Sequence, residues 1–278
     1  MHDDHVRGIS KLTAKYTDAD FVISAVFNDN EAIAFISAYG GGTSTRLTGG
    51  AKELFAALNG RSNVIIAVHR NIIIEKKTVT VTALSPMHGA FAQSVAHFAQ
   101  YLPKKGDSIN HAPALGPNLE AIVLHIDLGD DAILLGSDLE EHASYGWSAV
   151  ISDRWSGARR PATAYKVAHH GGESGDCPHL WETLLESEPV ACMTPWSLAG
   201  KRLPTDTDQQ RIKGNTSHAY ISSGASSRPQ MDNHQLKRLG DMAKNIKLVD
   251  SGFGVVRLRK KIGAKSWDTE LFGTAQKL

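Results

Sequence analysis

The sequence predicts one α/β domain over residues 1–278, in which helices flank a mixed β-sheet. Short apolar runs rich in β-branched residues and leucine alternate with helical patterns along the chain, without repeats or a linker-like stretch. Two of these runs, Ala121–Ile126 and Ala132–Leu135, are separated by Gly129-Asp130-Asp131 and predict a hairpin. A third run, Thr163–Ala168, ends in His169-His170 and two glycines. The alternation of strands and helices predicts the fold class, and the residues at the ends of these strands are the candidates for a functional site.

Composition and charge favour a globular protein with its own core. Hydrophobic residues make up 41% of the chain and charged residues 21%. The formal net charge of +1 gives no field that strongly attracts nucleic acid or an anionic membrane, although it is compatible with a local basic groove for nucleic acid. Cys177 and Cys192 form neither a disulfide framework nor a thiolate cluster, so a reducing, cytoplasmic setting is expected. No apolar run has the length of a membrane span, and residues 1–5 are unlike a signal peptide.

Before the hairpin, apolar periodicity predicts a series of helices and strands. In order, we expect a helix through Lys15, a strand at Phe21–Phe27, helices at Glu31–Tyr39 and Thr48–Leu58, strands at Asn63–Val68, Ile72–Glu75 and Thr78–Leu84, and a helix at Phe91–Leu102. Gly40-Gly41-Gly42 lacks both a preceding strand and the Gly-Lys-Ser/Thr ending of a phosphate-binding loop. We therefore interpret the three glycines as a connector.

After His170 the alternation continues to the end of the chain. In order, we expect a helix at Pro178–Ser187, a buried strand at Pro189–Pro195, a helix from Leu203 to about Lys213, a strand at Ser217–Ser222, a helix at Asn233–Asn245 and a strand at Gly254–Lys261. Residues 262–278 are polar and are expected to form a peripheral tail.

Aspartate and histidine stand where predicted strands end. Asp138 follows Gly136-Ser137 at the end of the second hairpin strand, and His169 and His170 follow the third run. Because strand ends can aim side chains into a crevice at the edge of a sheet, these residues are candidate metal ligands. A turn former or a helix cap is the alternative for Asp138. A structural turn, in contrast, has no need of two imidazoles.

The first five residues are a second cluster of this kind. His2, Asp4 and His5 offer imidazole and carboxylate groups, which are ligand types that Zn²⁺ accepts. The alternative is a disordered, polar N-terminus.

Several short motifs follow one another in a defined order. They are Ala83-Leu84-Ser85-Pro86, Asn118 before Ala121–Leu124, Leu134-Leu135-Gly136-Ser137-Asp138, Lys166–Gly172, Thr194-Pro195-Trp196 and Leu203-Pro204. In this order they resemble the metallo-β-lactamase fold, in particular the branch similar to the C-terminal domain of the DNA-uptake protein ComEC. His2-Asp3-Asp4-His5 is similar to the last four residues of the H-x-H-x-D-H loop of that family. The resemblance covers Ser85 to about Ile221 and the first nine residues.

The resemblance implies an αββα sandwich that holds one or two Zn²⁺ or Mn²⁺ ions. It assigns Asp4, His5, Asp138 and either His169 or His170 to one ion, and His2 and Asp138 to the other, with Asn118 near the place of a further ligand. The histidine of the pair that is not a ligand would donate to a developing oxyanion, and the sequence leaves open which one it is. Asp4, Asn118 and His170 are the catalytic candidates that we take from the resemblance, with the choice between His169 and His170 left open.

The chain also departs from this family pattern. The first histidine of the loop and the strands that precede it in the family do not appear before Met1. Either Met1 is internal to a longer gene product, or the first sheet lacks strands and is expected to leave an exposed edge. The stretch between His5 and Asn118 is longer than the family needs, which predicts an insertion at about residues 28–60.

The function that the resemblance implies is metal-dependent hydrolysis of a phosphodiester, as in a nuclease or phosphodiesterase, by a metal-activated water. The alternatives are a catalytically impaired binding module that pairs with a partner chain, and a hydrolase of a small-molecule lactone or ester. A membrane partner is not expected, and the sequence gives no indication of the oligomeric state.

Overall fold

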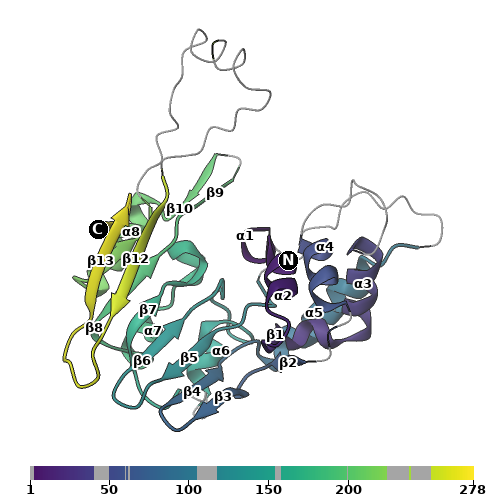
Figure 1. Ribbon diagram of the computed structural model, residues 1–278, viewed down its shortest axis with the longest axis horizontal. Coiled ribbons are helices and arrows are strands. Elements are labelled where there is room, and N and C mark those ends of the chain that lie inside the picture. The colour runs from purple at the N-terminus through teal and green to yellow at the C-terminus, as the bar shows by residue number, and fades with distance from the viewer. Residues whose placement is uncertain are drawn as a thin grey trace.

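The computed structural model describes residues 3–40, 50–59, 61, 63–104, 118–153, 158–198, 200–223, 238 and 252–278, with the side chains of residues 3, 4 and 40 left out. These residues form the predicted α/β fold, built on an eight-stranded mixed sheet (Figure 1). The helices are α1 (Asp3–Val6), α2 (Ile9–Lys15), α3 (Asn30–Gly40), α4 (Gly50–Leu58), α5 (His88–Gln100), α6 (Trp147–Ser152), α7 (Pro178–Thr183) and α8 (Asp206–Asn215), with 3-10 turns η1 (Ala25–Asn28), η2 (Ala168–Gly171) and η3 (Glu173–Gly175).

Strands make up four sheets. They are β1 (Phe21–Ser24), β2 (Val64–Ala67), β3 (Ile72–Lys76), β4 (Val79–Ala83), β5 (Leu124–Asp127), β6 (Ala132–Leu135), β7 (Ala162–Lys166), β8 (Leu185–Met193), β9 (Trp196–Leu198), β10 (Lys201–Leu203), β11 (Ala219–Ile221), β12 (Gly254–Arg259), β13 (Asp268–Gly273) and β14 (Gln276–Lys277). The large sheet has the order β14-β11-β8-β7-β6-β5-β4-β3, and β1-β2, β9-β10 and β12-β13 are separate pairs.

The centre of the large sheet changes from antiparallel to parallel pairing at β6. The predicted hairpin is confirmed, because β5 and β6 pair antiparallel with Leu124 opposite Leu135. The next neighbours, β6 with β7 and β7 with β8, pair parallel. The carboxyl ends of β6 and β7 therefore lie at the same rim, which is where the sequence has its aspartate and its histidine pair.

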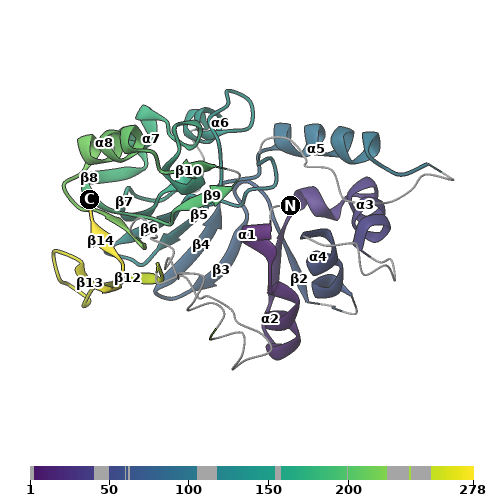
Figure 2. The same cartoon turned by 90° about the horizontal axis from the view of Figure 1, so that it is seen from above.

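The main hydrophobic core lies between the sheet and helices α6, α7 and α8, which cover one of its faces (Figure 2). Alternate residues of β6 explain this, because Ala132 and Leu134 are buried, whereas Ile133 and Leu135 on the other face are half-buried. Trp147 of α6 and Tyr165 of β7 are fully buried in this core and meet edge to face. Most of the chain from β4 to β11 is thus held by one continuous core.

A second, smaller core lies beside the sheet. Parallel strands β1 and β2 pack with α3, α4 and α5, and Phe27, Phe35 and Phe98 make its aromatic centre. Figure 1 shows these elements together on the side of the molecule where the N-terminus lies. The described part of the predicted insertion, residues 28–60, contributes α3 and α4 to this core.

Some element boundaries differ from the sequence-based prediction. The predicted strand Phe21–Phe27 ends at Ser24 and continues as the 3-10 turn η1, and the predicted helix Pro178–Ser187 ends at Thr183, because Leu185 pairs with Ala162 of β7. The predicted helix Asn233–Asn245 lies outside the described residues, apart from Arg238. Local periodicity could not show these limits, since strand pairing sets them.

The C-terminal residues 262–278 were expected to form a peripheral tail, but part of this segment forms two β-strands. Residues 268–273 form β13, which pairs with β12, and residues 276–277 form β14, which pairs with β11 as an edge strand of the large sheet. Leu278 packs against the main core, and its backbone amide donates to the Ala219 carbonyl at 2.9 Å. Among the described helices, none combines the length and the apolar character needed to cross a bilayer.

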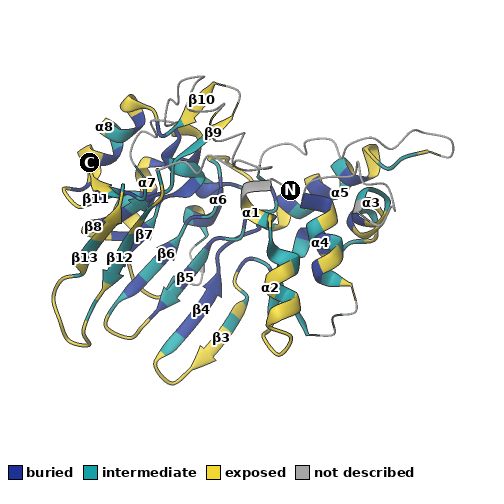
Figure 3. Cartoon of the chain, turned by 45° about the horizontal axis from the view of Figure 1, so that its top comes forward, coloured by how far each residue is buried: buried dark blue, intermediate teal, exposed yellow. Residues whose placement is uncertain are grey.

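The opposite edge of the large sheet is β3. Ile72 and Ile74 of this strand are each 43% exposed, and Figure 3 shows the contrast with the mostly buried neighbour β4. An edge strand with exposed apolar side chains favours pairing between copies of a chain.

We expect the double substitution Ile72→Lys with Ile74→Lys to raise the concentration at which the protein begins to aggregate, because lysines on an edge strand oppose strand pairing. Light scattering during concentration measures the onset. Ile33→Lys on α3, where Ile33 is 50% exposed, is the control. An equal gain in both variants would show that charge alone, and not the β3 edge, sets the solubility.

Candidate metal site

The parallel pairing of β6 and β7 positions Asp138 and His170. Two backbone hydrogen bonds join the loops that follow these strands: the amide of Gly136 donates to the Lys166 carbonyl at 2.9 Å, and the amide of His169 donates to the Ser137 carbonyl at 3.0 Å. Position 136 must be glycine for this approach, because a Cβ there would lie 2.8 Å from the Ala168 nitrogen. The two loops therefore act as one unit.

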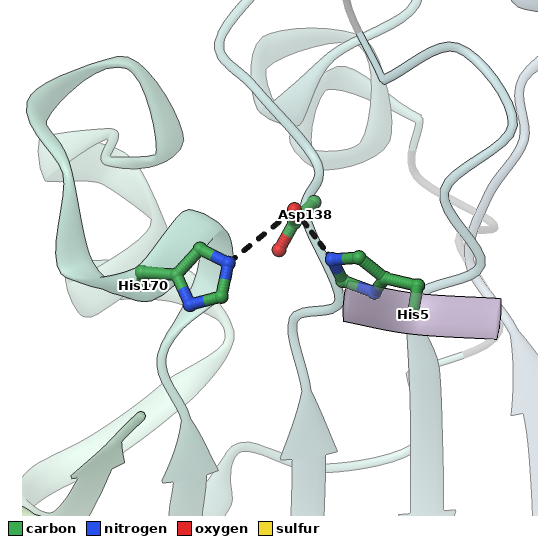
Figure 4. Close-up of side chains that lie close together, drawn as sticks. All are labelled: His5, Asp138 and His170. Carbon is green, nitrogen blue, oxygen red and sulfur yellow. Dashed lines mark hydrogen bonds and ion pairs between the residues drawn. The ribbon is translucent and has the colours of Figure 1, made fainter. Parts of the chain in front are cut away.

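The third member of the site comes from the N-terminus. Helix α1 lies at the same rim and brings His5 to Asp138, and the two side chains point toward one another in Figure 4. His5 Nε2 lies 2.7 Å from Asp138 Oδ2, and His170 Nε2 lies 3.7 Å from the same oxygen. One ligand atom from each of the three residues lies within 4.8 Å of the others. Residues more than 130 positions apart in sequence thus meet at one point.

The backbone of the site is strained. Ser137, His169 and His170 have φ angles of 49°, 44° and 55°, in the left-handed region that non-glycine residues rarely adopt. Each such residue costs about 1–2 kcal/mol. Strain of this kind persists only where the surroundings enforce it, and it is concentrated at functional sites.

The hydrogen bond of His170 fixes its tautomer. Nδ1 lies 3.0 Å from the Thr194 carbonyl oxygen, which can only accept, so Nδ1 carries the proton. In the neutral ring Nε2 then presents its lone pair on the side of Asp138. Trp196 stacks on the His170 ring with centroids 6.2 Å apart, which holds the plane of the imidazole. A histidine whose other nitrogen donates to a carbonyl has the arrangement typical of a metal ligand.

Asp138 is buried, yet it stays ionised. Burial raises the pKa of its carboxyl group, but the hydrogen bond and charge of His5, with the charges of His170 and His169, outweigh burial and bring the pKa below its usual value. Burial lowers the pKa of the nearby Lys166 amine, and the charge of Asp138 offsets only part of this effect; the amine donates to the Val167 carbonyl at 3.3 Å. The site is therefore an anion held among imidazoles.

This set of groups fits a divalent cation. Two ligands of a tetrahedral Zn²⁺ lie about 3.3 Å apart, and the two distances to Asp138 Oδ2 lie on either side of that value. His5 would have to give up its hydrogen bond to Asp138, because both would then offer lone pairs to the cation. Imidazole and carboxylate together suit Zn²⁺ or Mn²⁺.

The other residues that the sequence suggested for the site are not part of the group formed by His5, Asp138 and His170. His169 is outside the group, and its Nδ1 lies 2.8 Å from Ser174 Oγ. Asn118 donates to Glu140 Oε1 at 2.8 Å rather than to the group. His2 lies outside the described residues, and Asp4 belongs to α1 with a side chain that is not described. Of the histidine pair, His170 is thus the one that lies in the candidate group.

Sequence reasoning missed Arg211, which braces the histidine loop. Its guanidinium donates to the Gly171 carbonyl at 2.7 Å, to Asp176 Oδ2 at 2.6 Å and to Asp208 Oδ1 at 2.6 Å. The motif Thr205-x-x-Asp208 marks the start of a helix in the sequence, but it does not show what the helix packs against. Arg211 therefore connects α8 to the residue that follows His170.

A cavity of about 190 Å³ adjoins His5 and Asp138. Its walls are mostly apolar and come from α1, α2, β1, α4 and the segment before β5. Sequence patterns could not predict this cavity, because its walls combine residues from both hydrophobic cores.

No family model, curated protein or solved structure matches this chain.

The ion pair between Arg211 and Asp208 predicts a pH-dependent contribution to the free energy of unfolding. Burial raises the pKa of Asp208, but hydrogen bonds from Arg211 and Thr205 outweigh it and lower the pKa overall. We expect Asp208→Asn to reduce the free energy of unfolding by about 1–3 kcal/mol at pH 7. Because the folded-state pKa is the lower one, this stabilisation is present above about pH 4 and is lost as the pH falls through the folded-state value.

Urea unfolding of both proteins between pH 7 and pH 3 measures this difference. Asp206→Asn is the matched control, since Asp206 belongs to the same helix and its side chain is 91% exposed. A gap between Asp208→Asn and the unaltered protein that stays constant with pH would contradict the role of the carboxylate charge.

Proposed function

We propose that this protein is a metal-dependent hydrolase whose metal ligands include His5, Asp138 and His170. The observation that carries the proposal is the meeting of two imidazoles and one ionised carboxylate at strained loops beyond β6 and β7. The order of the sequence motifs supports a metallo-β-lactamase-like αββα sandwich as part of the same proposal.

Each residue has a defined part in this proposal. Asp138 supplies the negative charge that holds a cation, and His5 and His170 supply neutral nitrogen ligands. A divalent cation held there would lower the pKa of a bound water to about 7. His169, half-buried beside the group, would donate a hydrogen bond to the oxyanion that develops on the substrate. Asn118, which lines the adjoining cavity, is held by its hydrogen bond to Glu140.

Two substrate classes follow from different observations. The resemblance favours a phosphodiester, and the apolar cavity beside the site favours a carboxylic ester or a lactone. A binding module that pairs with another chain is the alternative of a different kind, and it would need no bound cation for its role.

The first test is metal binding. We expect the purified protein to bind Zn²⁺ or Mn²⁺, and Asp138→Asn or His170→Ala to weaken binding by more than the roughly 10–100-fold that loss of an outer partner costs. Isothermal titration calorimetry measures the affinity. Asp130→Asn in an exposed turn and His179→Ala, whose side chain is 72% exposed, are the controls.

The second test is hydrolysis by the metal-loaded protein. We expect turnover of bis-p-nitrophenyl phosphate or of a p-nitrophenyl ester, abolished by Asp138→Asn. His169→Ala should keep its metal yet lose about 10²–10³ in rate, the usual effect of removing one oxyanion donor. A fully metal-loaded protein that is inert on phosphodiesters, esters and lactones would leave the binding module as the better account.

A further inference from the structure

The candidate metal site lies between two separately packed parts of the chain. Asp138 and His170 follow strands of the large sheet, whereas His5 belongs to α1, which packs against α4 of the smaller core. Figures 1 and 2 show α1 between the large sheet and the helices of that core. Ser10 of α2 strengthens the attachment, because its backbone amide and its hydroxyl both donate to Glu53 of α4, at 3.1 Å and 2.6 Å. We call the smaller core, with α1 and α2, the N-terminal unit.

One covalent junction between the two parts is the short segment from β2 to β3. Strand β2 ends at Ala67 in the separate pair β1–β2, and β3 begins at Ile72 in the large sheet. A two-stranded pair is only marginally stable by itself. Arg70 in this junction has a φ angle of 70°, in the left-handed region, and such a conformation persists only where the surroundings enforce it. The side chains of this segment are therefore placed to fix the angle between the pair and the large sheet.

Three side chains, His69, Arg70 and Asp153, form a clamp at this junction. His69 Nδ1 lies 2.8 Å from the Leu84 carbonyl oxygen just after β4, and its Nε2 hydrogen-bonds Asp153 Oδ2 just after α6. Arg70 donates to the same carboxylate from two nitrogens, at 2.8 Å to Oδ2 and at 2.5 Å to Oδ1. Charge-assisted contacts made at two points are among the stronger hydrogen bonds in proteins.

The clamp is partly shielded from water and leads to the segment that carries Asp138. The side chains of His69 and Asp153 are 5% and 17% exposed, so solvent screens their contact less than it screens a surface pair. Helix α6 begins shortly after Asp138 and ends just before Asp153. At its start, Trp147 Nε1 donates to the Leu139 carbonyl at 3.1 Å. Asp153 is thus connected through α6 to the loop of Asp138.

The other side of the clamp leads to His5 through the pair β1–β2. Ala67 at the end of β2 pairs with Ser24 at the end of β1, and β1 lines the same cavity as His5 and Asp138. A rotation of β1–β2 relative to the large sheet would therefore move the surroundings of His5 relative to Asp138.

We propose that Asp153 is a positioning residue for the candidate metal site. With the rest of the clamp it holds the N-terminal unit in the place where His5 reaches Asp138. The inference rests on the proposed metal-binding function and deepens it. Asp153 does not touch the cation and acts through the elements that it connects. A ligand from the four-residue helix α1 needs such support from outside the helix, because a metal site requires a fixed geometry.

A double-mutant cycle on Zn²⁺ affinity, measured by competition with a chelating dye, tests this coupling. We expect Asp153→Asn to raise the Kd for Zn²⁺ about tenfold, the lower end of the effect of losing an outer partner of a metal site. In a His5→Ala background the same change should cost less than about twofold, because the ligand that Asp153 positions is gone. Asp127→Asn is the matched control, since Asp127 is buried and pairs with Arg160 at 3.3 Å within the large-sheet part of the chain.

Arg70→Ala is the milder second variant, because the Arg70 side chain is 51% exposed, and circular dichroism checks the fold of each protein. We expect it to raise the Kd in the same direction, but by less. A loss in Asp153→Asn that is equally large in the His5→Ala background, or that Asp127→Asn reproduces, would show that Asp153 serves the stability of the fold alone. Either result would overturn the proposal, as would an unchanged Kd.

A distance measurement tests the clamp without any cation. Nitroxide labels at Leu12→Cys on α2, where Leu12 is 59% exposed, and at His179→Cys on α7 report the distance between the N-terminal unit and the large-sheet part, in a background with both native cysteines replaced by alanine. By double electron–electron resonance we expect Asp153→Asn to broaden the distance distribution of the metal-free protein, and Asp127→Asn to leave it unchanged.

A distribution that stays narrow in Asp153→Asn would overturn the positioning role, even where Zn²⁺ binding and hydrolysis stand. A broadened distribution in a protein that binds no Zn²⁺ would instead remove the proposed function and support the role of Asp153 in placing the N-terminal unit.

Discussion

The pairing of β6 with β7 is the constraint on which the candidate site depends. Because the strands run parallel, both chain segments leave the sheet at the same rim, and backbone bonds at Gly136 and His169 then join them. Asp138 and His170 are therefore positioned by backbone and not by flexible side chains alone. Rigid support of this kind is what a metal or catalytic group requires for a fixed geometry. A shift in the register of either strand would separate the carboxylate from the imidazole.

The N-terminal helix, in contrast, depends on the site. Helix α1 has four residues, which is far too short to be stable alone. The contact between His5 and Asp138 links it to the sheet, and a cation bound by both residues would strengthen that link. A ligand that binds only the native state adds to its stability, so metal binding and the folding of this segment are expected to be coupled.

The sequence predicted those parts of the site that depend on local order. Asp138 and the histidine pair could be placed because strands β6 and β7 have clear apolar patterns and end just before them. His5 was a candidate by residue type, but only the folded chain shows that it meets Asp138. The sequence could not choose between His169 and His170, since the choice depends on the Thr194 carbonyl. Arg211 was missed for the same reason: its role arises from neighbours, such as Gly171 and Asp176, that are distant in the chain.

The strained backbone of the two loops supports a functional role for them. Ser137, His169 and His170 hold an unfavourable backbone conformation, and hydrogen bonds from Arg211 to Gly171 and from the Ala168 amide to the Tyr165 hydroxyl at 3.1 Å keep the second loop in place. A loop that served only to connect two elements would not need this bracing, because a glycine or asparagine could relieve the strain. The cost is explained if the conformation serves to aim His170 at Asp138. The apolar cavity next to them adds to the effect, because charges interact more strongly where water is excluded.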